Sequence, residues 1–359
     1  MDTKTLWTRL LAFALACALV VLPAGCAPEA ESSGPANGED ARSHTIAESS
    51  ADAGRERDMT EGEGMPYTAD TLVSDVMADP AFDGFGRLLF PVDAGYMQGS
   101  TLRDIRLTWY SAIDPSETAA ELNRLREDAL SGRQVFFPIY SEQEMSEDPR
   151  KRDTGLFFFR GNTGARTAIC NAGGGFAYVA ALHDSFPHAF ELSKMGYNAF
   201  ALIYRPGART ACEDLSRAIA FLFENAEALG VDMDGYSLWG GSAGARMAAW
   251  VGTHGTQAFG GREFPKPAAV IMEYTGLSEV VGSEPPTFSV VGTADGIADW
   301  RVMESRTNRI RANGTPAEIE VFEGLSHGFG LGTGTQAEGW IEEAVRFWQE
   351  AIKTQEENR

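Results

Sequence analysis

The stretch that most constrains this chain is residues 236–249, where the pentapeptide G-x-S-x-G stands between a predicted strand and a predicted helix. The apolar run 236–239 is typical of the end of a buried strand, and the Ala-rich run that begins at Ala243 is typical of a helix. Ser242 is therefore expected at a strand-to-helix corner, where flanking glycines let the backbone turn sharply and pack closely. In a Gly-rich chain the same pentapeptide also fits a plain loop, so the neighbouring strand and helix carry the argument.

A serine at such a corner can act as a nucleophile if a base lies beside it, at the positive end of a helix. The base would be one of five histidines, His44, His183, His188, His254 and His327. His327 follows the predicted strand 318–322, so we expect it at the carboxyl end of the sheet, the edge where Ser242 also lies. The other four lie in an acidic linker, before the serine in the chain, or about three turns along the helix that Ser242 begins.

A histidine base needs a carboxylate that orients it, and we expect that carboxylate at the end of the preceding strand. The run 290–295, V-V-G-T-A-D, places Asp295 there. Asp299 is the alternative, although its position at the start of a predicted helix also suits an N-cap. Ser242, Asp295 and His327 are thus each expected at the carboxyl end of a strand of their own.

A Gly-rich run, 173–175, directly follows the predicted strand 167–170 and offers backbone amides with no side chains in the way. The amide of Gly174 or Gly175, paired with that of Ala243, would stabilise a developing negative oxygen. The alternative is a phosphate-binding loop, but the chain lacks G-x-G-x-x-G and the Gly-Lys-Ser/Thr ending of a P-loop. No His/Cys cluster suggests a metal site, and 232–235 lacks the rest of a calcium loop. No cofactor or metal is expected.

The order of predicted elements favours an α/β fold. From residue 167 onward strands alternate with helices, which predicts a mainly parallel sheet covered on both faces. The aromatic runs 135–140 and 156–159 predict antiparallel leading strands, and Pro138 argues that the first is at an edge. We expect one domain, 67–359, whose extension 67–134 contains predicted helices but no assignable motif. In that extension Trp109 and Tyr110 either line a substrate entrance or pack in the core.

The N-terminal segment 1–25 is typical of an export signal, with a positive start, the apolar run 10–22 and small residues before Cys26. It is similar to a bacterial lipoprotein signal, which implies that Cys26 becomes the acylated first residue of the mature chain. The alternative is an ordinary secretory signal, which would release the protein. Residues 27–66 are rich in Glu, Ser, Gly, Ala and Asp, which predicts a disordered acidic linker with a reach of about 35 Å.

Two further features limit the function and the redox chemistry. The net charge of −21 disfavours nucleic-acid binding, which needs a basic surface. If Cys17 leaves with the signal and Cys26 carries lipid, Cys170 and Cys212 remain as an even pair in a compartment that can be oxidising. We expect both at the ends of neighbouring strands, which would allow a disulfide, and two buried free thiols fit the sequence equally well.

From residue 167 to the C-terminus, these motifs resemble the α/β-hydrolase superfamily, near its esterase/lipase branch and its carbohydrate-esterase-like relatives. The run Asn171-Ala-Gly-Gly-Gly175 departs from the His-initial and Pro-Gly-Gly-Gly forms of those relatives. The resemblance implies the chain order nucleophile, acid, histidine, which Ser242, Asp295 and His327 match.

The expected function is an exported serine hydrolase, a carboxylesterase anchored by its N-terminal lipid on the extracytoplasmic face of the membrane. Its substrate would be a small-molecule or saccharide ester, and the sequence sets no oligomeric state. The alternatives are a lipid-anchored binding protein that has lost activity and a serine peptidase.

Overall fold

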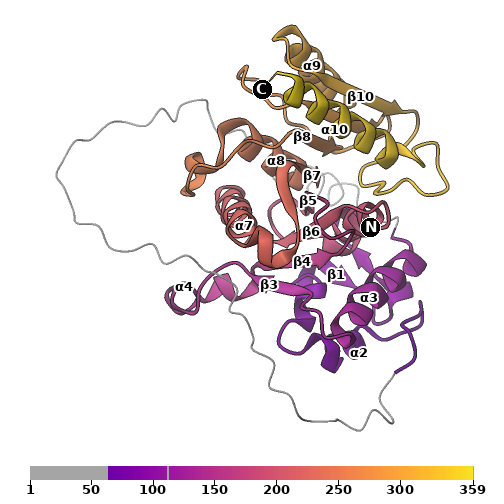
Figure 1. The fold of residues 1–359 in the computed structure, drawn as a ribbon. Helices are drawn as coiled ribbons and strands as arrows, with labels where there is room; N and C mark the ends of the chain where they lie inside the picture. The colour runs from indigo at the N-terminus through magenta and orange to yellow at the C-terminus, as the bar shows by residue number, and fades with distance from the viewer. Residues whose placement is uncertain (1–63, 111–112, 359) are drawn as a thin grey trace, which may run out of the picture. The chain divides into compact units, whose positions relative to one another are not determined.

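The computed structural model describes residues 64–110 and 113–358, all of them within one compact unit (Figure 1). The predicted signal segment 1–25, Cys26, His44 and the predicted linker up to residue 63 lie outside the described residues. None of the described helices has the length and apolar character needed to cross a membrane.

Eight described strands form one sheet in the order β10-β9-β8-β7-β5-β6-β4-β3. Every pair from β10 to β6 is parallel, whereas β4 runs antiparallel to β6 and β3 antiparallel to β4. The strands are β3 (Phe136–Pro138), β4 (Gly155–Phe159), β5 (Arg166–Asn171), β6 (Asn198–Ile203), β7 (Asp232–Gly241), β8 (Ala269–Glu273), β9 (Thr287–Gly292) and β10 (Ala317–Phe322). The predicted parallel sheet with antiparallel leading strands is confirmed, and Pro138 lies on the edge strand as expected.

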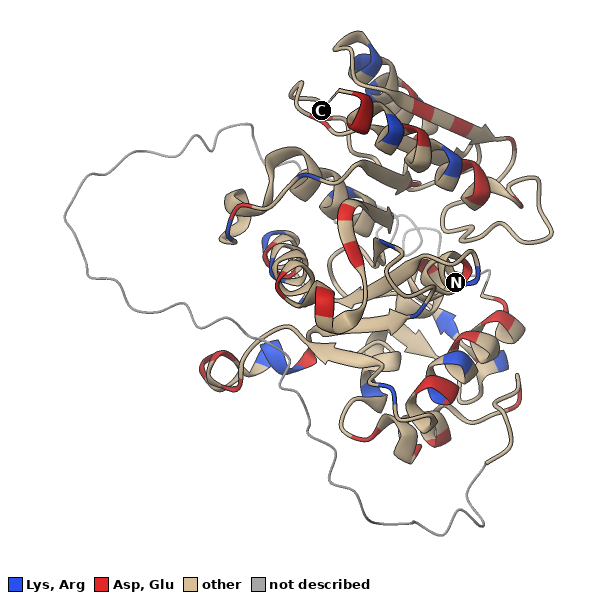
Figure 2. Cartoon of the chain, in the orientation of Figure 1, with Lys and Arg blue, Asp and Glu red and all other residues tan. Residues whose placement is uncertain are grey.

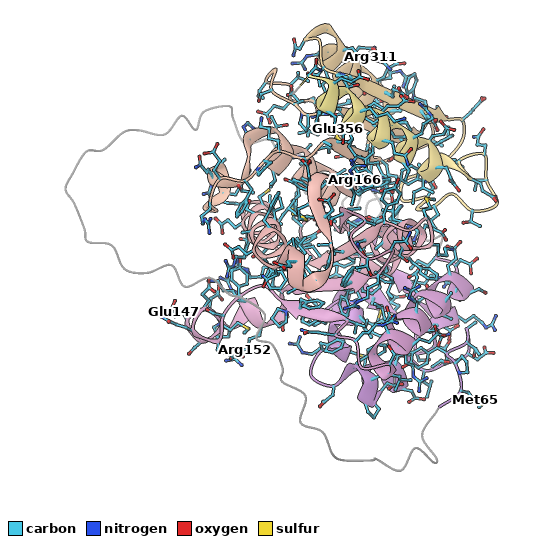
Figure 3. The ribbon with its side chains drawn as sticks, viewed as in Figure 1. Met65, Glu147, Arg152, Arg166, Arg311 and Glu356 are labelled. Atoms are coloured by element: carbon cyan, nitrogen blue, oxygen red, sulfur yellow. The ribbon has the colours of Figure 1, made fainter. Side chains whose placement is uncertain are left out.

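Helices cover both faces of this sheet. Successive side chains of β7 point to opposite faces and contact helices on each of them. Trp239 packs towards α10 (Trp340–Glu357), with its ring centroid 6.3 Å from that of Trp340. The next residue, Gly240, faces the first turn of α8 (Ala243–His254), where an added Cβ would lie 2.5 Å from the carbonyl carbon of Gly244. The end of α10 is fixed by an ion pair of 2.9 Å between Glu356 and Arg166 of β5 (Figure 3).

Some of the remaining helices begin or end at signals that the sequence carries. Asp114 caps α3 by accepting the backbone amides of Ser116 and Glu117, and Gly230, with φ 67°, ends α7. The helices other than α8 and α10 are α2 (Val73–Met77), α3 (Pro115–Leu130), α4 (Glu142–Glu147), α5 (Ala181–Asp184), α6 (Phe186–Lys194), α7 (Ala208–Leu229) and α9 (Trp300–Ala312). Acidic residues are prominent on β10 and α10 (Figure 2).

The structure differs from the sequence prediction in two places. The polar connection between β3 and β4 contains α4, which a capping box between Ser141 and Glu144 begins. Helix α7 begins at Ala208, so Cys212 is a helical residue and not, as expected, the end of a strand. Cys170 on β5 and Cys212 are both buried free thiols, so the disulfide option is wrong. Burial raises the pKa of Cys212 to about 12, which keeps the thiol protonated and unreactive.

The N-terminal extension packs against the leading edge of the sheet. It contains α2, α3 and a two-stranded antiparallel ribbon of β1 (Met97–Gln98) and β2 (Arg106–Leu107). Phe85 stacks on Phe136 of β3 at 5.3 Å and meets Phe157 of β4 edge-on. The extension therefore shares the core of the sheet, and its chain leads from β2 directly to Trp109 and Tyr110.

Candidate active site

Ser242 occupies the corner between β7 and α8. Its backbone has φ 52° and ψ −112°, a conformation that a residue with a side chain rarely adopts. Its amide donates to the carbonyl of Glu273 at the end of β8, at 2.9 Å, which holds the corner against the neighbouring strand. Gly244 is required two residues later, because an added Cβ would lie 1.9 Å from the carbonyl oxygen of Asn171. The predicted corner is confirmed, and the Ser242 side chain is partly exposed.

His327 and Asp295 lie beside this serine, each on the loop that follows its strand. The Nε2 atom of His327 is 3.1 Å from Ser242 Oγ, and its Nδ1 atom is 2.8 Å from Asp295 Oδ2. A carboxylate only accepts, so Nδ1 carries the proton and Nε2 of the neutral ring accepts from the serine hydroxyl. The structure thus brings together the three side chains that the sequence singled out.

Asp295 is held in place by its second oxygen, which accepts the backbone amides of Ile297 and Ala298, both at 2.7 Å. Asp299, the alternative acid, instead caps α9 by accepting the amide of Arg301 at 3.0 Å. The two aspartates therefore have separate roles, and only Asp295 contacts His327.

The Gly-rich loop passes directly over Ser242. An added Cβ on Gly173 would lie 2.9 Å from Ser242 Cβ. The amide of Gly173 is already engaged, because it donates to Asp184 Oδ2 at 2.8 Å. The amides of Gly174, Gly175 and Ala243 make no hydrogen bond within the described part of the chain. These three are the amides predicted to bind a negative oxygen, and they remain free to do so.

Asp184 is the residue of this site that the sequence analysis missed. Its buried carboxylate accepts the Tyr110 hydroxyl at 2.6 Å, the Gly173 amide and the Tyr274 hydroxyl. Burial first, and then the charge of Asp184, raises the pKa of both tyrosines well above the ordinary value, so they stay protonated donors. One carboxylate thus ties the Gly-rich loop to the extension and to β8. A single aspartate in a four-residue helix carries no sequence signal of this role.

Two buried histidines lie next to the site and make hydrogen bonds to its loops. His183 Nε2 donates to the carbonyl of Gly328, next to His327, at 2.6 Å, and burial lowers its pKa, which favours the neutral ring. His188 Nδ1 donates to the carbonyl of Asp184 at 2.6 Å, while its Nε2 lies 3.1 Å from a carboxylate oxygen of Glu273. Neither histidine contacts Ser242, which agrees with the choice of His327 as the candidate base.

Backbone strain is concentrated around this site. Among the described non-glycine residues, four have positive φ: Trp109, Phe176, Ser242 and Tyr274. Trp109 is 42% exposed and its ring covers Gly175, Phe176 follows that glycine, and the Tyr274 ring lies 5.0 Å from the His327 ring. Strain of this kind costs about 1–3 kcal/mol per residue and tends to gather at functional sites. Of the two aromatics left open by the sequence, Trp109 is exposed at the site and Tyr110 is buried beneath it.

A cavity of about 420 Å³ lies on the far side of the His327 loop, between that loop and α3. Ser326 and Gly328, the neighbours of His327, line it together with Asp114, Glu117 and Glu121. In the described residues no group of three or more His, Cys, Asp or Glu side chains could hold a metal ion.

Comparison with known proteins finds one family model that matches part of the chain and several similar folds. Residues 162–302 match the family model BD-FAE, a range that includes Ser242 and Asp295 and ends before His327. The fold is similar to the acetyl ester-xyloside bifunctional hydrolase from Caldicellulosiruptor lactoaceticus, with 21% identity, a TM-score of 0.53, and coverage of 60% of this chain and 95% of that one. No curated protein sequence matches the chain.

A second similar structure is the thermophilic esterase from the Planctomycetes species Thermogutta terrifontis, determined with propionate bound. It shares 20% identity with a TM-score of 0.50, over 60% of this chain and 93% of that one. At these identities the likeness concerns the fold, and the chain has an α/β-hydrolase fold.

Proposed function

We propose, from this α/β-hydrolase fold, that the chain is a serine hydrolase that cleaves carboxylic esters. The observation that carries the proposal is the position of His327, whose two ring nitrogens bridge Ser242 Oγ at 3.1 Å and Asp295 Oδ2 at 2.8 Å. A neutral imidazole held in this tautomer is ready to take the serine proton.

In the first half of the reaction, His327 removes the proton of Ser242 as Oγ attacks the ester carbonyl carbon. Asp295 stabilises the imidazolium that forms and keeps its orientation. The carbonyl oxygen becomes negative, and the free amide of Ala243, with that of Gly174 or Gly175, donates to it. His327 then gives its proton to the departing alcohol, which leaves an acyl group on Ser242.

In the second half, His327 takes a proton from water, and the resulting hydroxide attacks the acyl-enzyme. The same amides stabilise the second negative intermediate, and the proton returns to Ser242 as the carboxylic acid leaves. Each such amide is worth about 3–4 kcal/mol of transition-state stabilisation in comparable serine hydrolases.

The test is hydrolysis of a short p-nitrophenyl ester by the purified protein and by its Ser242→Ala variant. We expect kcat to fall by about 10⁶-fold with little change in the thermal melt, because Ser242 Oγ contributes one partly exposed hydrogen bond. The exposed Ser278→Ala is the matched control and should keep full activity. Retained turnover in Ser242→Ala would remove the assignment. A wild type inert towards esters would favour a binding protein on a hydrolase fold.

The choice of first substrates follows the similar proteins. One of them is described as a hydrolase of acetyl esters and xylosides, so acetylated xylosides and simple acyl esters of increasing length form the first panel. An exposed aromatic ring beside the Gly-rich loop, Trp109, suits stacking on a sugar or an aryl group.

We also propose that the enzyme works outside the cell, tethered by a lipid on Cys26. The sequence up to residue 66 supports this, because a short apolar signal ending in small residues and a cysteine precedes an acidic, low-hydrophobicity segment. Cys26→Ser should abolish incorporation of labelled fatty acid and release the protein into the medium. Unchanged lipid labelling in that variant would contradict the tether.

A further inference from the structure

Helix α8 exposes one narrow stripe, and that stripe begins at the nucleophile. The residues at the corner and along the helix that are not buried are spaced by four: Ser242, Arg246, Trp250 and His254. Side chains four apart lie on one face of a helix, and each points back towards the helix N-terminus. Arg246 is therefore the first side chain that a ligand meets when it extends from Ser242 along α8.

The guanidinium of Arg246 lies at the rim of the site. Its Nη2 atom is 3.8 Å from the position that a Cβ would take on Gly276. Gly276 stands two residues after Tyr274, whose ring contacts His327. On its other side the guanidinium lies 5.8 Å from the centre of the Trp250 ring, which in turn stacks on Phe176 of the Gly-rich loop.

Arg246 lacks a carboxylate partner, although the chain carries a net charge of −21. It makes no ion pair and no hydrogen bond of its side chain within the described residues, and its polar neighbour is the Trp250 ring. Burial alone lowers its pKa, without a nearby charge to offset that effect. Arg205, which is more deeply buried than Arg246, is neutralised by Asp214 at 2.6 Å and Asp148 at 3.0 Å.

We infer that Arg246 is an anion subsite that binds a carboxylate carried by the ester substrate, an assignment that rests on the proposed esterase function. A planar guanidinium matches a carboxylate with two parallel hydrogen bonds, and partial burial strengthens them. The N-terminus of α8 adds positive potential on the same side. The stacked rings of Trp250 and Phe176 beside the guanidinium offer an apolar surface to the rest of such a substrate. The substrate class is therefore an ester of a hydroxy-carboxylic acid or a half-ester of a dicarboxylic acid.

The experiment measures kcat/KM for two matched ester pairs with the purified domain. Mono-p-nitrophenyl succinate is compared with p-nitrophenyl butyrate, which tests a carboxylate on the acyl arm. Acetoxybenzoate is compared with acetoxybenzamide, both substituted at the para position, which tests the alcohol arm. The wild type should favour the charged ester in at least one pair, and Arg246→Gln should lower that charged-to-neutral ratio about ten- to a hundredfold. Arg246→Lys, which keeps the charge but not the fork, should fall between them.

Arg262→Gln is the matched control. This arginine also lies over an aromatic ring, Phe264, but it is exposed and pairs with Glu224, so its loss removes the same charge without changing the ratio. A wild type with no preference in either pair, or an Arg246→Gln variant with an unchanged ratio, would overturn the inference while leaving the esterase assignment intact. Absence of turnover for all four esters would contradict both the esterase assignment and this inference. If Arg246→Gln does not fold, the ratio for Arg246→Lys decides.

Discussion

Two histidine–carboxylate pairs in the described part of the chain differ in what surrounds them. His327 and Asp295 approach to 2.8 Å, and the second ring nitrogen of His327 faces a serine hydroxyl at a partly exposed corner. His188 and Glu273 approach to 3.1 Å with side chains 1% and 0% exposed, and the second ring nitrogen of His188 is spent on a backbone carbonyl. The second pair has no nucleophile and no path to solvent.

This difference shows that a histidine next to a carboxylate is not by itself a catalytic base. Nε2 of His327 faces the Ser242 hydroxyl, from which the proposed reaction removes a proton, whereas the two ring nitrogens of His188 face a backbone carbonyl and a buried carboxylate. The two pairs also lie close together, because the backbone carbonyl of Glu273 accepts the backbone amide of Ser242. That contact belongs to the main chain, so the carboxylate of Glu273 is left to its partner His188.

The largest expected effect follows from His327→Ala, which removes the base. We expect kcat for ester hydrolysis to fall by about 10⁶-fold, as for loss of the nucleophile, because the two act as a unit. His254→Ala, an exposed histidine at the far end of α8, serves as control and should retain activity. If His327→Ala kept more than a few per cent of the wild-type rate, the contrast between the two pairs would lose its basis.

Asp295→Asn should come next, with a loss of about 10⁴-fold in kcat, because an amide at this position favours the wrong ring tautomer. Asp299→Asn is the matched control four residues later. It weakens only the cap of α9, which costs at most about 1 kcal/mol of stability, and should leave kcat unaltered. Equal losses in the two variants would contradict the separate roles of these aspartates.

Asp184→Asn should reduce kcat by about 10²-fold with a smaller change in KM, since a shifted Gly-rich loop weakens donors that act only in the transition state. Tyr110→Phe removes one of the donors to the same carboxylate and should have a milder effect in the same direction. A change confined to the melting temperature, with kcat intact in both variants, would reduce Asp184 to a purely structural role.

The smallest effect on activity and the largest on stability is expected from Glu273→Gln. Removing one partner of a buried pair costs about 3–5 kcal/mol, while Ser242 keeps its backbone contact with residue 273. Chemical unfolding with urea at neutral pH measures this loss. If Glu273→Gln unfolded at the same urea concentration as the wild type, the pair would have no structural role.

The pH dependence of stability sharpens the same contrast. Burial by itself lowers the pKa of His188, but the charge of Glu273 overrides it and the net shift is upward; burial raises the pKa of Glu273 itself. Groups that bind protons more tightly when folded stabilise the fold at low pH and lose that contribution as pH rises. The difference in free energy of unfolding between the wild type and a His188→Gln/Glu273→Gln double variant should therefore shrink as pH rises, from about pH 4.5 for the contribution of Glu273 and from about pH 6.5 for that of His188. A stability difference that grows as pH rises would contradict this prediction.

The sequence predicted those parts of the site that follow a strand. Ser242, Asp295 and His327 each stand directly after a β-rich run, so a parallel sheet gathers them at one edge whatever the details of packing. Asp184 lies in a short helix and carries no such signal, and Glu273, although it ends β8, pairs with a histidine of α6, so only packing brings these two carboxylates to their partners. Arg246 was overlooked because an arginine on an Ala-rich helix is ordinarily solvated.

Strands and helices with strong hydrophobic periodicity were predicted correctly, whereas elements with weak periodicity were missed. Buried strands and long amphipathic helices have a clear hydrophobic pattern. Helix α4 is short and polar, and the signal for its start is a capping box and not an apolar face. The place of Cys212 was misjudged because α7 begins at Ala208, so that Ala211 and Cys212 are already buried in its first turns. Helix boundaries of this kind depend on local capping and neighbouring loops.

The central claim, that the relay through His327 makes Ser242 nucleophilic, is tested most directly by labelling with a fluorophosphonate. Intact-mass measurement of the purified domain should show one covalent adduct on the wild type, located at Ser242 by peptide mapping, and none on Ser242→Ala or His327→Ala. Absence of an adduct on the folded wild type, or equal labelling of His327→Ala, would contradict the account.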